Sequence, residues 1–398
     1  LMLSYWLSPQ RWAPGVLWTE TEWAAAAGHP SISICAAWVA TFLNTLNPGR
    51  AATNETLALM ALETIASGDP RPATDPRACS IPDDQIYDAA TNPGGVRCGF
   101  PDYMPSILGL RPPERWGPIE QALGRGFVNR PLDNIGVQYG LGALKAGDIT
   151  IAQFLDLNAH IGSYDIDLVR QTDRVEADPD ALAVAYRGGL INQATNSTLP
   201  IIDIRQWDPA EIHHDYRSYV MRARLDRAHG HHDNQVIWTG LTSDAVYSPA
   251  VSSHALTVMD QWLAAIEADT SDLPYEQKVI KNKPLDARDR CAGPNNIELA
   301  DQSLCPALYP YYVSPRIVAG QGFTDDTVKC QLKPLLTSDY SPLHFTDAQW
   351  AQLQGIFPKG VCDYSKPGVQ QQPTLPWQIY SAGPGGQPIA AAPISTNF

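Results

Sequence analysis

Five of the nine histidines of the chain fall within one stretch, IIDIRQWDPAEIHHDYRSYVMRARLDRAHGHHDNQVIW, residues 201–238. Imidazoles beside carboxylates can form a catalytic acid–base pair, a metal site or a solvated surface cluster. Along the stretch, a β-branched apolar segment leads to Asp208, then to a helix-like segment and a second apolar segment. The order of these elements predicts which of the side chains can meet.

The elements around the stretch predict a parallel strand–helix–strand unit. Residues 199–207 and 234–240 have the composition of short strands, and residues 209–230 between them predict a helix that begins at a proline and ends at a glycine. Residues 254–269 predict an amphipathic helix after a loop. The functional edge of such a unit lies at the carboxyl ends of its strands, so Asp208 is expected there.

Asp208 and a histidine could supply two members of a Ser–His–Asp triad. In α/β-hydrolases the nucleophile comes first, the acid follows the penultimate core strand and the histidine follows the last strand. Asp208 follows the first predicted strand, and His254 follows the second and opens the last helix. His213, about one turn after Asp208, is the alternative base, and His214 is a weaker one. The acid would hold the imidazole in the tautomer that takes a proton from a serine.

The same residues also allow less specific explanations. An aspartate before a proline is often a turn or helix cap, and His254 could lie on a solvated helix face. Imidazoles and carboxylates are zinc ligands, but neither H-x-x-x-H nor H-E-x-x-H occurs, and adjacent helical residues point about 100° apart. We therefore expect no metal site, and keep a metal-dependent hydrolase built on residues 213–232 as an alternative.

The chain has no sequence motif that marks a catalytic nucleophile. No G-x-S-x-G elbow occurs, and neither G-x-G-x-x-G nor a Walker-type loop is present, so we expect no cofactor. The chain opens with LMLSYWLSPQRW, without an initiator Met or the regions of a signal peptide. We expect the serine to lie on an N-terminal segment upstream of Leu1, with which this chain associates. A non-catalytic binding or scaffold protein of the same fold is the other alternative.

Composition and cysteines narrow the class of protein. With a net charge of −14 and a pI near 5.0, neither nucleic acid nor an anionic membrane is expected as a partner. No apolar run is long enough to span a bilayer.

The cysteines allow three local disulfides: Cys79 with Cys98, Cys291 with Cys305, and Cys330 with Cys362. Disulfide cross-links in Pro/Gly-rich segments are typical of secreted or periplasmic proteins, so we expect this chain to be one. Cys35 is left over, as a buried thiol or as the partner of an upstream cysteine.

Several long stretches resemble an uncharacterised family of large bacterial secreted proteins, catalogued as a domain of unknown function. The matching stretches are RPLDNIGVQYGL, QFLDLNAHIGSYDID, RARLDRAHGHHDNQVIW, MDQWL and FTDAQWAQLQGIFPKGVCDYSKPGVQQQP. Members of this family look like α/β-hydrolases, distantly similar to tannase/feruloyl esterases and to 3-hydroxybutyrate-oligomer hydrolases.

The resemblance implies an α/β fold class, the C-terminal part of an α/β-hydrolase fold. Residues 1–70 would be late core and the start of a lid, 71–198 a mainly helical lid, 199–269 the closing strands and helices, and 270–398 a disulfide-stapled wrapping tail. The serine elbow of such proteins lies in an N-terminal half that precedes this part. The resemblance supports Asp208 as the acid and favours His213 as the base. The expected function is serine hydrolysis of an oligomeric or aromatic ester.

Overall fold

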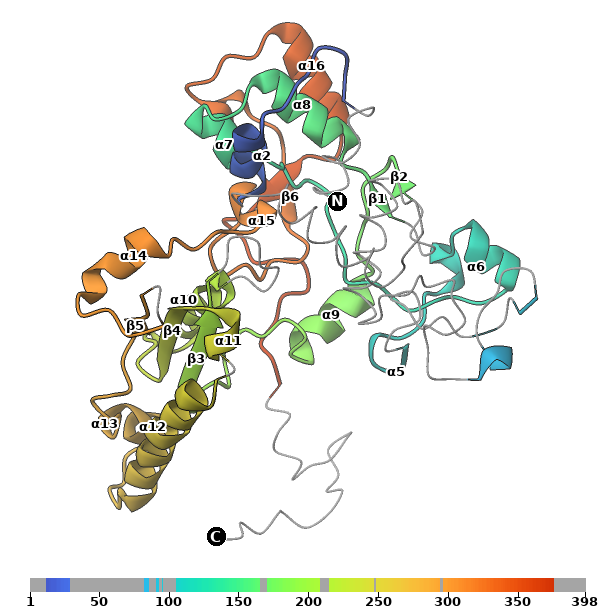
Figure 1. The fold of residues 1–398 in the computed structure, drawn as a ribbon. Coiled ribbons are helices and arrows are strands. Elements are labelled where there is room, and N and C mark those ends of the chain that lie inside the picture. The colour runs from blue at the N-terminus through green and yellow to red at the C-terminus, as the bar shows by residue number, and fades with distance from the viewer. Residues whose placement is uncertain are drawn as a thin grey trace.

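The computed structural model describes residues 12–28, 82–85, 91–92, 95, 105–164, 170–207, 215–246, 248–293 and 296–375. Within these ranges the chain forms a small parallel α/β unit, a helical body and long connecting segments (Figure 1).

The α/β unit is built on a three-stranded parallel sheet with the strand order β3–β4–β5. The strands are β3 (Ile201–Gln206), β4 (Gln235–Leu241) and β5 (Arg290–Cys291). The helices of the two crossovers are α10 (Tyr216–His229), α11 (Ser243–Val246), α12 (Pro249–Ala268) and α13 (Tyr275–Lys281). Parallel neighbours require crossovers of this kind. The predicted parallel strand–helix–strand unit is thus confirmed.

Helix α12 covers one face of the sheet with apolar side chains. Val258 and Trp262 lie four residues apart on the buried side of the helix and pack in one cluster with Val236 and Trp238 of β4. Trp262 is fully buried, and its indole Nε1 donates to the Val279 carbonyl oxygen at 2.8 Å. This cluster fixes the helix to the strands and is the apolar core of the α/β unit.

The opposite face of the sheet is polar and lies against α10. The Gln235 amide nitrogen donates to the Asp203 carboxylate at 2.6 Å and to the Ser218 carbonyl oxygen at 3.2 Å. Arg222 of α10 donates to the Gln235 amide oxygen at 3.3 Å and to both carboxylate oxygens of Asp289 at 2.6 and 2.8 Å. These hydrogen bonds join β3, β4, α10 and the residue that precedes β5.

Two helix starts of the α/β unit differ from the prediction. Helix α12 begins at Pro249, because the Ser248 hydroxyl accepts the Val251 N–H at 3.3 Å and caps the first turn. His254 therefore lies in the second turn instead of opening the helix. Helix α10 begins at Tyr216, later than the predicted start at residue 209, and ends as predicted at a glycine with φ of 81°.

The helical body gathers segments that are far apart in the sequence. It consists of α2 (Glu20–Ala27), α7 (Leu141–Ala146), α8 (Ile151–His160), α15 (Pro315–Val318), α16 (Asp347–Ile356), and the antiparallel strands β6 (Gln331–Lys333) and β7 (Val361–Asp363). Trp23, Phe154, Leu157 and Leu353 are fully buried in its core. Thr150 and Thr346 form capping boxes that start α8 and α16. Figure 1 shows α2, α7, α8 and α16 together at the top of the molecule.

Shorter elements complete the described chain. They are η3 (Asp83–Gln85), α5 (Pro105–Leu108), η5 (Pro113–Arg115), α6 (Pro118–Leu123), β1 (Ser163–Tyr164), β2 (Arg170–Gln171), α9 (Pro179–Arg187), η6 (Gln302–Leu304), α14 (Cys305–Leu308) and η7 (Thr337–Tyr340). None of the described helices combines the length and the apolar character that crossing a bilayer requires.

The segment after the α/β unit connects the two bodies. It contacts the unit through Pro310, whose carbonyl oxygen accepts from the Trp207 indole at 3.1 Å, and then contributes α15, β6, α16 and β7 to the helical body. It returns to α9, where the Leu375 N–H donates to the Arg187 carbonyl oxygen at 3.0 Å.

Strand β5 lies beyond residue 269, so the sheet extends past the predicted end of the closing core. The division into lid, core and tail stays a prediction.

Two of the three expected disulfides are present. Cys291 is bonded to Cys305, and Cys330 is bonded to Cys362. The second bond lies in the core of the helical body, between β7 and the residue that precedes β6. Cys79, Cys98 and Cys35 lie outside the described residues.

The disulfides predict a graded effect on stability. Replacing Cys330 and Cys362 by alanine should lower the free energy of unfolding by about 2–4 kcal/mol, because the bond restricts a loop in the unfolded chain. The bonded cysteines are 32 residues apart here, against 14 for Cys291 and Cys305. The disulfide that closes the longer loop should therefore stabilise the fold by about 0.7 kcal/mol more than the other one, because it removes more entropy from the unfolded chain. Urea unfolding of both double variants tests this, and an unchanged midpoint for the 330/362 variant would contradict it.

Candidate functional site

Because β3, β4 and β5 are parallel, their C-terminal ends lie at the same edge of the sheet. We call the edge marked by Gln206, Leu241 and Cys291, the last residues of β3, β4 and β5, the carboxyl edge of the sheet. The Trp207 N–H donates to the Leu241 carbonyl oxygen at 3.2 Å, which joins the chain leaving β3 to the end of β4. In open α/β sheets, ligands bind at the carboxyl ends of the strands.

Asp208 and His213, the predicted acid and one predicted base, lie outside the described residues, as does His214. The described chain leaves β3 at Trp207 and resumes at Asp215, just before α10. Trp207 and Asp215 both lie near the carboxyl edge, because Trp207 is bonded to Leu241 and Asp215 contacts β4.

Asp215 is a candidate that sequence reasoning missed. Its side chain is buried, and its carboxylate accepts from the Thr239 hydroxyl of β4 at 3.3 Å. Burial raises the pKa of Asp215 to about 6, while the Thr239 hydrogen bond and the Arg205 charge lower it in part. A carboxyl group poised near neutral pH is typical of acid–base sites. The only signal in the sequence is its position directly after the two histidines of HHDY.

An aromatic wall of Trp207, Tyr219, Tyr309, Tyr311 and Tyr312 lies beside Asp215. The Trp207 ring is 5.5 Å from that of Tyr309 and 6.4 Å from that of Tyr312, and Tyr219 stacks on Tyr311 at 4.7 Å between centroids. Burial raises the pKa of Tyr219 to about 12, and the nearby Asp215 carboxylate adds to this. Burial and Asp215 raise the pKa of Tyr312 in the same way. Two members of the wall, Tyr219 and Tyr312, are therefore close enough to Asp215 to respond to its charge.

Gly240 allows the wall to approach the sheet. It has φ of 76°, and a Cβ atom there would lie 2.6 Å from the Tyr309 ring and 2.7 Å from the Ala292 carbonyl oxygen. The Tyr309 hydroxyl donates to that same carbonyl oxygen at 2.5 Å. Only glycine leaves room for this packing and adopts the backbone conformation without strain.

His254, the other predicted base, lies on the opposite face of the sheet. Its imidazole is 5.0 Å from the Trp238 ring, and Trp238 points toward α12, whereas the next residue, Thr239, reaches Asp215 on the α10 side. Successive side chains of a strand point to opposite faces. Within the described chain, the fold therefore separates His254 from Asp215.

His254 has an acidic partner of its own. Its Nε2 atom lies 2.6 Å from a carboxylate oxygen of Asp286, which also forms an ion pair with Arg290 at 2.7 Å. The hydrogen bonds from His254 and Arg290 lower the pKa of Asp286 to about 2. Both side chains are nearly half exposed. His254 also lines a cavity of about 140 Å³, together with Asn296 and Glu298. This geometry fits a solvated ion-pair network better than a buried triad.

The remaining histidines of the cluster lie at the other end of the sheet. His229, His231 and His232 precede β4 at its amino end, and each lies within 2.8 to 3.6 Å of a carboxylate oxygen, of Glu276 or Asp226. Helix α10, about 21 Å long at 1.5 Å per residue, runs between Asp215 and these three histidines. Within the described chain no group of three potential ligands is assembled for a metal.

The described helices and the small parallel sheet define an α/β protein. A family model described as a tannase-like family of unknown function (DUF6351) matches residues 1–373, and the chain belongs to this family. The expected resemblance to an uncharacterised tannase-like family is thus confirmed. No curated protein and no solved structure matches the chain.

The pKa of Asp215 predicts a pH-dependent effect of its replacement. Between about pH 4 and pH 6 the folded carboxyl group still binds a proton that the unfolded chain has released, so rising pH destabilises the wild-type fold. Asp215→Asn removes this penalty. Its free energy of unfolding, measured against wild type by urea titration, should increase by on the order of 1–3 kcal/mol from pH 4 to pH 7 and then stay level.

Asp269→Asn is the matched control because its shift has the opposite sign. Hydrogen bonds from Ser271 and Asn282 hold the pKa of Asp269 below its ordinary value, so the control should lose stability at neutral pH and approach wild type in acid. A difference between Asp215→Asn and wild type that is constant from pH 4 to pH 7 would contradict the buried-carboxyl interpretation.

Proposed function

We propose that this chain supplies the acid and the base of a serine hydrolase of the carboxylic-ester class, with its active site at the carboxyl edge. One observation carries the proposal. The segment that holds Asp208 and His213 joins Trp207 to Asp215, and both of these residues lie at the edge where parallel α/β sheets place their ligands. Membership of a tannase-like family supports hydrolysis as the type of reaction.

Each residue has a separate role in the proposed site. Asp208 orients the imidazole of His213, which accepts the proton of the attacking serine and returns it to the leaving alcohol. Asp215, two residues after His213, becomes negatively charged above about pH 6 and then favours the imidazolium form of a neighbouring histidine. His254 is the alternative base, and its hydrogen bond to Asp286 on the other face argues against that role.

The nucleophile is proposed to come from outside this stretch of chain. No G-x-S-x-G elbow occurs in it, and among the described residues no strand pairs with the outer edge of β3. A sheet that continues beyond β3 would bring a serine-bearing strand to the same carboxyl edge. The oxyanion hole would come largely from that segment, since one donor is the backbone N–H after the nucleophile.

The substrate and the compartment follow from the same features. The aromatic wall offers flat apolar surfaces with polar rims, which suit an aromatic or oligomeric ester. Two disulfides favour an oxidising compartment, so we propose a secreted or periplasmic enzyme. A binding protein of the same fold is the alternative, and the absence of any ester hydrolysis would favour it.

Kinetics of single variants test the assignment of the site. In the native full-length protein, Asp208→Asn and His213→Ala should lower kcat for a 4-nitrophenyl ester by about 10³–10⁴, because the base loses its orientation or is removed. His254→Ala should lower kcat by less than about tenfold, since an exposed ion pair on the other face contributes little.

His232→Ala is the matched control, an exposed histidine paired with Asp226 at the amino end of the sheet. Circular dichroism verifies that each variant is folded. A loss of activity in His254→Ala with full activity in His213→Ala would reverse the assignment. Full activity in Asp208→Asn would remove Asp208 from the triad.

A further inference from the structure

His229 joins three segments that are separate in the sequence. It is the last residue of α10, and its ring lies between α13 and the residues that precede β3. Its Nε2 atom is 2.8 Å from the Ala194 carbonyl oxygen, and its Nδ1 atom is 2.9 Å from a carboxylate oxygen of Glu276. Only 11% of the His229 side chain is exposed, so water screens these contacts weakly.

Both ring nitrogens of His229 therefore lie beside oxygen atoms that accept hydrogen bonds. A neutral imidazole has one N–H group, so its other nitrogen would turn a lone pair toward an oxygen. The imidazolium form has a proton on each nitrogen and is attracted to both oxygens. Its charge also suits the C-terminal end of α10, where the helix dipole favours a cation. These surroundings favour the charged form of the ring.

Other charged groups lie on the elements that meet at His229. His231 competes for Glu276, because its Nε2 atom is 3.6 Å from the same carboxylate, and the two imidazole rings are 6.4 Å apart. The remaining groups have contacts of their own: His232 with Asp226, Arg227 with Asp326, Arg224 with the carbonyl oxygens of residues 192 and 324, Lys283 with that of Asp233, and Lys278 and Lys281 with Asp269. Residues 190–199 contribute no titratable side chain.

The contact with Ala194 holds the loop that leads into β3. Residues 192–199 are tied to the α/β unit by Arg224, which donates to the Asn192 carbonyl oxygen at 2.6 Å, and by Asn234, which donates to the carbonyl oxygens of Ser197 and Leu199 at 2.9 Å. Ala194 has φ of 63°, a conformation that residues with a Cβ atom adopt only where other contacts hold them. The His229 ring supplies one of these contacts.

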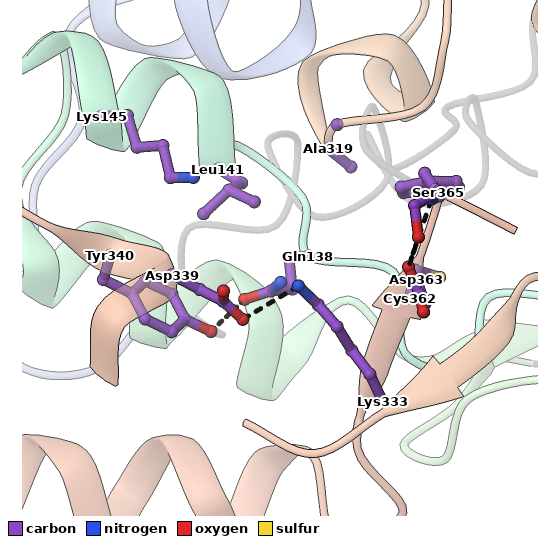
Figure 2. Close-up of a pocket in the computed structure, with 12 residues that line it drawn as sticks. Gln138, Leu141, Lys145, Ala319, Lys333, Asp339, Tyr340, Cys362, Asp363 and Ser365 are labelled. Atoms are coloured by element: carbon purple, nitrogen blue, oxygen red, sulfur yellow. Dashed lines mark hydrogen bonds and ion pairs between the residues drawn. The ribbon is translucent and has the colours of Figure 1, made fainter. Parts of the chain in front are cut away.

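An ion pair in the helical body shows the contrast with His229. Lys333 and Asp339 lie 3.0 Å apart beside the cavity between α7 and the β6–β7 hairpin (Figure 2). Pairs of lysine with aspartate keep both charges between about pH 5 and pH 8, whereas histidine changes its charge within this range. Of the two contacts, the one at His229 is therefore the one that responds to pH.

We propose that His229 is a pH-sensitive joint between α10, α13 and residues 192–199. The charged ring holds the Glu276 carboxylate and the Ala194 carbonyl oxygen together. When the pH rises and the ring loses one proton, the remaining proton stays at the carboxylate, the stronger acceptor, and Ala194 is released. The loop before β3 then opens more often. The joint lies at the amino end of the sheet and is independent of the proposed ester hydrolysis.

Urea unfolding of the full chain at about pH 5 and pH 8 tests the joint against His229→Gln, whose amide can bind Ala194 but carries no charge. The charged ring stabilises the fold at low pH, and this contribution is lost as the pH rises. The equilibrium constant for unfolding should therefore be about tenfold larger in His229→Gln than in wild type at pH 5, and less than about threefold larger at pH 8.

Two further variants serve as controls. Lys333→Gln removes an ion pair that keeps its charges, so its effect on the unfolding constant should be the same at both pH values. Glu276→Gln removes the carboxylate and keeps His229. In that background, His229→Gln should no longer have an effect that depends on pH, because the two residues act as a pair.

Hydrogen exchange locates the effect in the chain. The Ala194 N–H is bonded to the Asn192 side chain and the Ser197 N–H to the Ala194 carbonyl oxygen. After correction for the intrinsic effect of pH, both amides should exchange several-fold faster at pH 8 than at pH 5 in wild type, and equally fast at both in His229→Gln. A pH-independent difference in stability between wild type and His229→Gln overturns the proposal, as does exchange of residues 192–199 that does not change with pH.

Discussion

Parallel pairing of β3 with β4 sends both strands to the same edge of the sheet, and the locations of the described candidates Asp215 and His254 follow from it. The chain leaves β3 at Trp207 beside Leu241, the last residue of β4. The alternation of side chains along β4 then separates two environments. Trp238 faces the apolar helix α12 and His254, whereas Thr239 faces α10 and Asp215. A shift of this register by one residue would exchange the two faces.

Asp215 on the α10 side and Asp286 on the α12 side have pKa values that are shifted in opposite directions. Asp215 is buried, and its burial outweighs the Thr239 hydrogen bond, the Arg205 charge and the backbone hydrogen bonds that lower its pKa, so the pKa rises to about 6. Asp286 is exposed and bonded to His254 and Arg290, and its pKa falls to about 2. Burying a charge without full compensation is costly, and proteins accept that cost chiefly at functional sites. This contrast between Asp215 and Asp286 is the physical reason for proposing the α10 side as the place of the chemistry.

Local patterns were enough to predict much of the α/β unit. The apolar runs of β3 and β4 and the three- and four-residue spacing in α12 identified these elements, and cysteines close in sequence identified two disulfides. Helix starts were less predictable, because the Ser248 cap that begins α12 depends on local geometry. Nothing in the sequence indicated β5, because a two-residue strand is too short to show any periodicity.

The candidate site was less predictable than the fold, because its contacts join distant residues. Asp286 lies 32 residues after His254, and Tyr309 reaches the sheet only because Gly240 leaves space for its ring. Asp215 shows no pattern in the sequence, and only its burial against β4 marks it. Asp208 and His213 stay predictions, supported by the position of the described residues on either side of them.

Labelling with a fluorophosphonate probe tests the central claim most directly. The native preparation should form a covalent adduct at a serine outside residues 1–398, identified by mass spectrometry, because an activated serine attacks the phosphorus as it would an ester. The adduct should form far more slowly in His213→Ala and at the wild-type rate in Asp286→Asn. Failure of any serine to react in the native full-length protein would contradict the account, as would dependence of labelling on Asp286 instead of His213.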